Sequence, residues 1–192
     1  VVTCNYPKSD FASDMDKVRQ VAFVNDSILG ILMDSDNFSR IALIDLQDTT
    51  QPTLLKIVDS YDKIVLLRSS FDYNHLVYET RDGSITQIDA EGQSEFVTKF
   101  PNLVRDFRVK RIHNSLNNDM AQWSTESSEL VAFGLTSNGK LYANNIQLAS
   151  AVTSLEITDL LLLFTTAQHN LQFVHLNNSD FKPLPAVEDG VV

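Results

Sequence analysis

A short segment of the chain combines basic and aromatic side chains in a way that suits nucleic-acid binding. Aromatic rings can stack on bases, and lysine or arginine side chains neutralise phosphates. Asp106 interrupts the segment, so a solvated sheet edge or a protein contact is the competing interpretation. We therefore treat the segment as a candidate for contact with either RNA or a neighbouring protein. Its basic residues are Lys99, Arg105, Arg108, Lys110 and Arg111, and the aromatic residues among them are Phe100 and Phe107.

The polar insertion that follows, residues 114–128, is a second candidate for partner contact. It carries Met120 and Trp123 among mainly polar residues. Loops that project from a rigid scaffold often carry function, and large apolar side chains often anchor an interface. We therefore expect either partner docking through these two side chains or a surface loop with no binding role.

Histidine and cysteine residues are scattered rather than grouped. On an extended strand, the six-residue spacing of His169 and His175 separates their side chains by about 20 Å, which is too far for one metal ion. The other histidines, His75 and His113, are isolated, and the single cysteine, Cys4, has no activating neighbour. We therefore predict no metal site, no cofactor and no catalytic residue.

The acidic run that begins at Asp34 resembles the opening of a calcium loop. Phe38 then stands where the third oxygen ligand is needed, and Ser39 replaces the glycine of that motif. The run therefore predicts a solvated turn. Only 6 glycines occur, with no phosphate-binding loop, which argues further against an enzyme site.

The charge balance argues against general nucleic-acid binding. The 192 residues carry a net charge of -10, and the acid is uneven: residues 1–96 hold 8 basic and 16 acidic side chains, whereas residues 97–192 hold 7 and 9. One cysteine favours a reducing compartment, and we expect the cytoplasm. No apolar run approaches the roughly 20 residues of a membrane span, so we predict no membrane contact.

Short strands are the elements that must position all these residues. Apolar runs of strand length alternate with polar turns, as in Leu76–Thr80 and Ser84–Ile88. Asp82-Gly83 between those two runs predicts a tight hairpin, since its turn needs residues that tolerate positive φ. Asn138-Gly139 predicts a second hairpin, and residues 167–170 a third.

The strands recur in groups that begin near residues 18, 61, 104 and 151, at spacings of 43, 43 and 47 residues. Four-stranded units of about 40–45 residues are typical of a β-propeller. We predict an all-β chain with about four degenerate WD40-like β-propeller blades, each a four-stranded antiparallel sheet. Open sheet edges pair with other strands, so we expect these blades to belong to a larger ring. The whole chain, 1–192, is then a partial propeller with blades at 18–60, 61–103, 104–150 and 151–187.

Three stretches carry a resemblance to a known family: Gly134–Ala143, Ser150–Ser154 and Phe164–His169. They resemble the second WD40-like β-propeller of the largest, IKAP-type scaffold subunit of Elongator complexes, in its fungal form. The resemblance is strong over residues 128–187 and looser over residues 1–127.

The resemblance implies a non-catalytic scaffold that supports modification of the tRNA wobble uridine at C5, of the carboxymethyl type. Its implied partners are a catalytic radical SAM and acetyltransferase-like subunit and a WD40 subunit, with tRNA an indirect partner. It also implies dimerisation through regions outside this chain and a nuclear as well as a cytoplasmic location. The alternative is a propeller that contacts tRNA through residues 99–111. A third class, an unrelated propeller hydrolase or lectin, lacks support because no carboxylate, histidine or metal motif converges.

Overall fold

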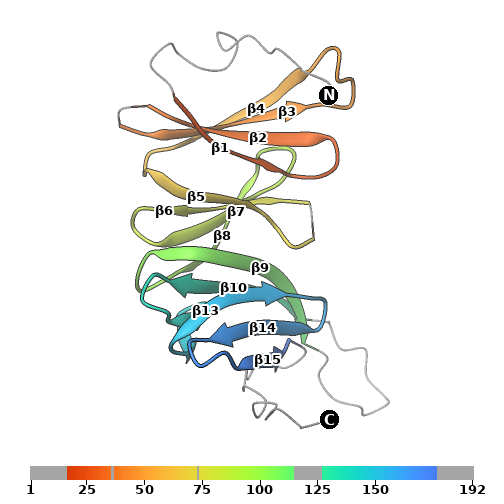
Figure 1. Ribbon diagram of the computed structural model, residues 1–192. Coiled ribbons are helices and arrows are strands. Elements are labelled where there is room, and N and C mark those ends of the chain that lie inside the picture. Colours follow the sequence, from red (N-terminus) through yellow and green to blue (C-terminus); the bar gives the residue numbers. More distant parts are fainter. Residues whose placement is uncertain (1–16, 36, 73, 115–126, 177–192) are drawn as a thin grey trace, which may run out of the picture. The chain divides into compact units, whose positions relative to one another are not determined.

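The computed structural model describes residues 17–35, 37–72, 74–114 and 127–176 (Figure 1). Every regular element in these ranges is a β-strand, and the strands form four antiparallel sheets. The predicted all-β class is therefore confirmed. No helix within the described ranges has the length and apolar character needed to cross a membrane.

Each sheet is a meander of strands that follow one another in the sequence, and we name the sheets A to D. Sheet A contains β1 (Lys17–Phe23), β2 (Ile28–Asp34), β3 (Ser39–Asp45) and β4 (Thr53–Ser60). Sheet B contains β5 (Ile64–Ser69), β6 (Leu76–Thr80), β7 (Ser84–Ile88) and β8 (Ser94–Lys99). Sheet C contains β9 (Val104–Asn114), β10 (Ser127–Thr136), β11 (Leu141–Ala143) and β12 (Ile146–Ala149). In the described part, sheet D contains three strands: β13 (Val152–Ile157), β14 (Leu161–Thr166) and β15 (Leu171–His175).

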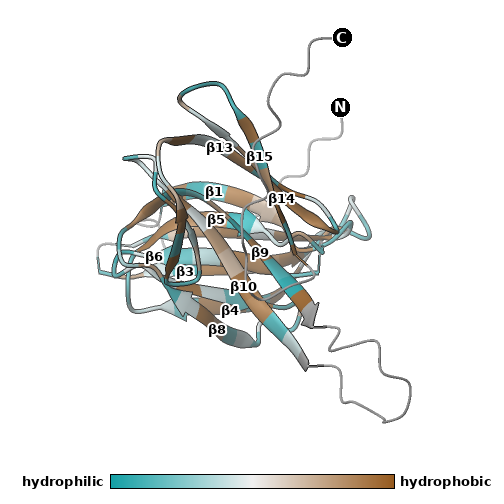
Figure 2. Cartoon of the chain, turned by 90° about the horizontal axis from the view of Figure 1, so that it is seen from below, coloured by the Kyte–Doolittle hydropathy of each residue, from teal (hydrophilic) through white to brown (hydrophobic). Residues whose placement is uncertain are grey.

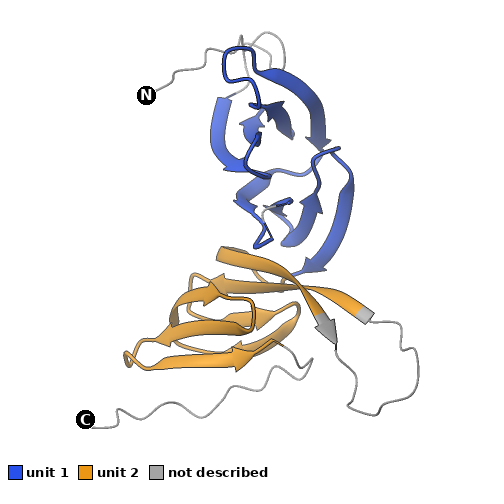
Figure 3. Ribbon diagram, turned by 90° about the vertical axis from the view of Figure 1, so that its right-hand side faces the viewer, with its two compact units in different colours: residues 1–99 blue, residues 100–192 orange. Residues whose placement is uncertain are grey.

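The chain divides into two compact units (Figure 3). Unit 1 covers residues 1–99 and holds sheets A and B, and unit 2 covers residues 100–192 and holds sheets C and D. The ends of the predicted insertion lie in strands of unit 2, because Asn114 of β9 pairs with Ser127 of β10. Each unit therefore contains two sheets that can be described together.

The core of unit 1 lies between sheets A and B. Leu32, Ile41 and Leu43 of sheet A are buried in the same cluster as Leu67 and Leu76 of sheet B. The sheets pack so closely that a Cβ atom at Gly30 would overlap the Leu76 side chain. Burial of such aliphatic side chains contributes about 1.5–3 kcal/mol each.

The core of unit 2 is built on apolar side chains of its strands, and the hydropathy colours of Figure 2 show brown apolar stretches beside teal polar ones along these strands. Phe107, Phe133 and Phe164 are fully buried. The Phe100 ring fills the space beside Gly134, where a Cβ would lie 2.5 Å from the ring. Strand β13 of sheet D contacts β9 and β10 of sheet C, so these two sheets share one unit.

A β-bulge marks the first strand of every sheet. The pairing of the first two strands shifts by one residue in each case, whereas the pairing of the second and third strands runs without a shift. A bulge re-aims the extra residue away from its normal position in the ladder. The extra residues are Arg19 in β1, Val65 in β5, Arg105 in β9 and Thr153 in β13.

The three hairpins predicted from turn residues are confirmed by the pairing of β6 with β7, β10 with β11 and β14 with β15. Gly83 and Gly139 have φ values of 86° and 78° in the first two turns, where glycine has no Cβ penalty. His169 adopts φ 64° in the third turn. The third hairpin therefore has the same shape without the glycine.

Candidate interaction surface

Lys99, the first residue of the predicted basic segment, forms an ion pair within unit 1. It lies at the end of β8, and its Nζ atom is 2.7 Å from Oδ2 of Asp82 in the β6–β7 turn. The hydrogen bond from Lys99, together with those from Thr80 and Ser84, holds the pKa of Asp82 well below its ordinary value. Lys99 thus stabilises a turn of its own sheet.

Arg105 connects the two sheets of unit 2. It is the extra residue in the bulge of β9, and its Nη2 atom donates a 2.6 Å hydrogen bond to the carbonyl oxygen of Thr153. Thr153 is itself the extra residue in the bulge of β13. The bulges in consecutive sheets are therefore joined by an arginine side chain.

Arg108 is surrounded by acidic groups. Its Nη1 atom lies 2.7 Å from Oδ1 of Asp106, and its Nη2 atom lies 3.6 Å from Oε2 of Glu156 on β13. Burial lowers the pKa of Arg108, but the hydrogen bond and charge of Asp106 and the charge of Glu156 outweigh that effect and raise it. The guanidinium group of Arg108 therefore stays charged, and two neighbouring carboxylates offset its charge.

Lys110 also contacts sheet D, and Arg111 contacts β10. The Lys110 Nζ atom donates to the carbonyl oxygen of Thr158 at 3.1 Å and lies 3.4 Å from Oδ1 of Asp159. The Arg111 Nη1 atom lies 3.5 Å from the Ser128 hydroxyl, at the limit of a hydrogen bond. Arg105 and Arg108 thus bind β13, and Lys110 binds the turn between β13 and β14.

The aromatic residues of the segment do not face solvent. Phe100 and Phe107 are buried in the core of unit 2 and could stack on a base only by leaving it. Met120 and Trp123, the apolar residues of the predicted insertion, lie outside the described residues. Of the residues predicted as contacts, Arg105, Arg108 and Lys110 lie together on β9, and all three side chains contact β13 or the turn after it.

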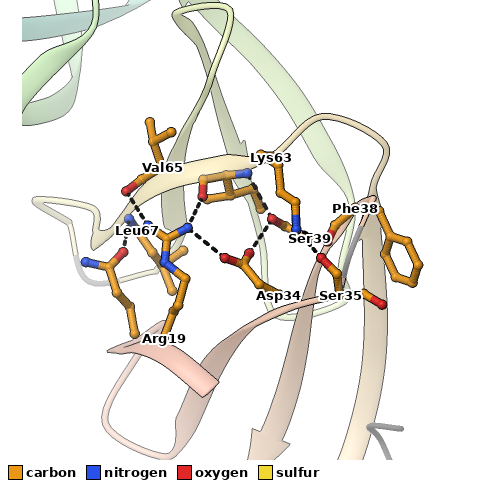
Figure 4. Close-up of polar contacts among 10 residues, drawn as sticks. Arg19, Asp34, Ser35, Phe38, Ser39, Lys63, Val65 and Leu67 are labelled. Atoms are coloured by element: carbon orange, nitrogen blue, oxygen red, sulfur yellow. Dashed lines mark hydrogen bonds and ion pairs between the residues drawn. The ribbon is translucent and has the colours of Figure 1, made fainter. Parts of the chain in front are cut away.

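Unit 1 contains a matching connection that sequence reasoning missed (Figure 4). Arg19, the bulge residue of β1, donates to the carbonyl oxygens of Ile64 at 2.8 Å and Val65 at 3.2 Å on β5. Its Nη1 atom also lies 3.0 Å from Oδ2 of Asp34. Counted from the bulge, Arg19 and Arg105 are equivalent, and each contacts the bulge residue of the next sheet.

Asp34 extends this network into the core. Its Oδ1 atom accepts a 2.7 Å hydrogen bond from the buried Ser39 hydroxyl, which accepts a 3.0 Å hydrogen bond from the Ile64 backbone amide. Lys63 adds hydrogen bonds to the carbonyl oxygens of Ser35 and Phe38. The predicted turn lies between β2 and β3, but Asp34 is more than a solvated turn residue, because its carboxylate holds Arg19 and Ser39 and these two side chains contact sheet B. Asp36 lies outside the described residues.

The loops of unit 1 also line an open cavity of about 420 Å³. Its lining is polar and includes Asn25, Asp26 and Asp72. Burial raises the pKa of Asp72, but hydrogen bonds from Ser70 and Asn74 and the charge of His75 outweigh that effect and lower it. Among the described residues, no three His, Cys, Asp or Glu side chains are grouped to hold a metal ion.

Comparison with known proteins gives one consistent result. The family described as the ELP1 N-terminal second β-propeller matches residues 1–192. Elongator complex protein 1 of Saccharomyces cerevisiae is 72% identical over 99% of this chain, and that of Schizosaccharomyces pombe is 25% identical over 96%. The chain spans 14% of the length of each of these relatives.

A solved structure supports the fold alone. The N-terminal domain of Nup159 is 18% identical and superposes with a TM-score of 0.53, covering 93% of this chain and 45% of that one. At this level of identity the match extends only to the arrangement of strands. It agrees with the propeller-like sheets described above.

Proposed function

Because this chain belongs to the family of ELP1 second N-terminal β-propellers, we propose that it is a non-catalytic scaffold module of an Elongator complex. In this role it holds other subunits in register while they modify the wobble uridine of tRNA. Its proposed partners are the catalytic radical SAM and acetyltransferase-like subunit and a WD40 subunit. We place it in the cytoplasm and the nucleus, and we assign dimerisation to regions outside this chain.

The observation that carries the proposal is that the cations of β9 tie sheets together. Arg105, Arg108 and Lys110 all bind groups of sheet D. Hydrogen bonds to charged groups stabilise a fold by about 1.5–3 kcal/mol when they are shielded from water, and by less when they are exposed. Such ties favour a rigid module, which is what a scaffold requires.

Apolar side chains outside the core offer the surface for protein partners. Tyr61 and Phe96 are exposed in unit 1, and Ile146 and Leu160 are exposed in unit 2. Aromatic and large aliphatic side chains commonly anchor protein–protein interfaces, although single exposed examples are normal on any surface. We propose that at least one of these four contacts another subunit.

The alternative function is tRNA contact through residues 99–111. Phosphate binding needs cations that can release their own partners, and each cation removed from an RNA contact lowers the salt dependence of binding. Lys99, Arg105 and Arg108 already bind Asp82, Thr153 and Asp106. RNA binding there would compete with contacts that hold the sheets, which favours the scaffold role.

Co-purification of the complex tests the proposal. We would replace Tyr61, Phe96, Ile146 and Leu160 by serine, singly and together, in the full-length protein. The scaffold role predicts that the combined variant keeps its thermal stability but recovers less of at least one other subunit, with a matching loss of wobble-uridine modification. Full recovery of every subunit by the combined variant would contradict the proposal. Tyr78→Ser, which alters a buried side chain, is the control for loss by unfolding.

A further inference from the structure

The turn between β10 and β11 contains an asparagine followed by a glycine, the residue pair at which asparagine loses its side-chain amide most readily. Glycine has no side chain to hinder its own backbone nitrogen, which can attack the amide of the residue before it. Asn138-Gly139 is the one Asn-Gly pair in the sequence, and the Asn138 side chain is exposed to water. The pair is therefore a candidate for chemical modification, which is independent of the scaffold role.

The reaction needs only groups of this turn and water. The Gly139 backbone nitrogen attacks the Cγ atom of Asn138, and the side-chain amide leaves as ammonia with the proton that the nitrogen gives up. The product is a five-membered succinimide ring. Water that attacks Cγ restores the peptide bond and leaves aspartate, whereas water that attacks the main-chain carbonyl leaves isoaspartate, whose main chain runs through the former side chain.

The folded turn holds both reacting groups in hydrogen bonds. The Gly139 amide donates to the carbonyl oxygen of Thr136 at 3.0 Å, and the Thr136 hydroxyl donates to Oδ1 of Asn138 at 2.5 Å. The Gly139 carbonyl oxygen accepts a 2.9 Å hydrogen bond from the Val152 amide, at the start of β13. Attack on Cγ requires the Gly139 amide to rotate away from these partners, so the turn must first open locally.

We propose that Asn138 is a deamidation site that the folded turn gates, because the succinimide forms only when the contacts with Thr136 and Val152 open. The gate is a property of unit 2 alone, since both contacts lie between sheets C and D of that unit. Loosening of this hairpin thereby turns a reversible opening into a permanent covalent change.

The turn accommodates one product and not the other. Asp82 holds the equivalent position in sheet B, where its carboxylate accepts a 2.6 Å hydrogen bond from the Thr80 hydroxyl. Aspartate at position 138 can accept the same bond from Thr136. Isoaspartate instead adds a carbon atom to the main chain and displaces Gly139, whose Cα lies close against Val152. Isoaspartate is therefore the product that disrupts the contact between sheets C and D.

The rate of deamidation in the full-length protein tests the gate. Peptide mass spectrometry follows aspartate and isoaspartate at position 138 during incubation at neutral pH. We expect the reaction in native buffer to be at least about tenfold slower than in urea that unfolds the protein. We expect Thr136→Val to raise the native rate about fivefold, whereas Thr136→Ser, which keeps the hydroxyl, should stay within about twofold of the natural protein. Equal rates in native and unfolded protein, or an unchanged rate in Thr136→Val, would overturn the proposal.

Thr80→Val is the matched control, because it removes the equivalent hydroxyl of sheet B and should leave the rate at position 138 unchanged. A second measurement needs no variant and so covers a failure of Thr136→Val to fold. Hydrogen exchange of residues 137–140 in the natural protein reports how often the turn opens, and the slowing of deamidation should match this protection within about threefold. Deamidation that is much faster than turn opening allows would contradict the gate.

Discussion

The Arg105 side chain joins two bulges: it is the extra residue of β9, and it donates a 2.6 Å hydrogen bond to the carbonyl oxygen of Thr153, the extra residue of β13. The same relationship joins Arg19 of β1 to Val65 of β5. A bulge disrupts the ladder locally, and the arginine satisfies the carbonyl at that position. The same contact in both units shows that Arg19 and Arg105 each connect the first strands of two neighbouring sheets.

Loss of this tie should loosen β13. We expect Arg105→Met to lower the free energy of local opening of residues 152–157 by about 1 kcal/mol, or roughly fivefold faster amide exchange, since an exposed charge-assisted hydrogen bond is removed. Hydrogen exchange with mass spectrometry on the full-length protein measures this. The matched control is Arg111→Met on the same strand, whose contact with Ser128 is on β10. Unchanged exchange in β13 of the Arg105 variant would refute the tie.

Thr136 and Thr166 occupy equivalent positions before the β10–β11 and β14–β15 turns, and replacing each by valine should change hairpin stability in different ways. The Thr136 hydroxyl lies 2.5 Å from Oδ1 of Asn138 and accepts from the Lys140 amide, whereas the buried Thr166 hydroxyl has no hydrogen-bond partner among the described residues. We expect Thr136→Val to destabilise its hairpin by about 1–2 kcal/mol and Thr166→Val to be neutral or stabilising.

Local exchange of β11 and β15 in the two variants gives the measurement. Gln168→Asn is a further check, because it places a short amide at the position that Asn138 occupies in the other hairpin. We expect this amide to accept a hydrogen bond from the Thr166 hydroxyl and to slow exchange in β15. Equal destabilisation by both valine substitutions would argue against this account of the two turns.

The stability of the β6–β7 turn around Asp82 should depend on pH. Its folded pKa is lowered by Lys99 first, then by Thr80 and Ser84, so its stabilising effect is present above the unfolded value of about 3.9. That effect is lost as the pH falls toward the folded pKa. We expect protection of the β6–β7 hairpin, corrected for intrinsic exchange, to hold from pH 7 to about pH 5 and to fall below about pH 4.

Asn138 provides an internal control, since it occupies the equivalent turn of sheet C with an amide that does not titrate. Asp82→Asn should weaken the β6–β7 hairpin at pH 7 and lose its difference from the natural protein at low pH. The same pH dependence in Asp82→Asn as in the natural protein would show that another group is responsible.

Binding of tRNA by the complex should be insensitive to Arg108. Its charge is balanced by Asp106 and Glu156, so we expect Arg108→Gln to change tRNA affinity by less than about twofold and to leave its dependence on salt unchanged. If residues 99–111 bind phosphates, the salt slope should instead fall by about one for each phosphate interaction that a substitution removes. Binding measured at several salt concentrations separates these outcomes.

Much of the fold could be predicted because strand patterning is local. The runs at Leu76–Thr80 and Ser84–Ile88 match β6 and β7, since both apolar strands and turn residues can be recognised in the sequence. The resemblance to the largest Elongator subunit is confirmed by the matching family and by the yeast relative.

The bulges could not be predicted because their extra residues share no side-chain type. Arg19, Val65, Arg105 and Thr153 are a cation, an aliphatic residue, a second cation and a hydroxyl residue, and their position follows only from strand register. The cations of β9 therefore looked available for RNA. The acceptors of Arg105 and Lys110 in sheet D lie 48 residues away in the sequence, beyond the reach of any local pattern.

The scaffold role predicts which molecules lie next to this module, and crosslinking with mass spectrometry on the intact, tRNA-bound complex tests that most directly. The scaffold role predicts crosslinks from exposed positions such as Tyr61 and Phe96 to other subunits, and none from residues 99–111 to tRNA. Crosslinks from residues 99–111 to tRNA, with none from the module to any other subunit, would contradict it.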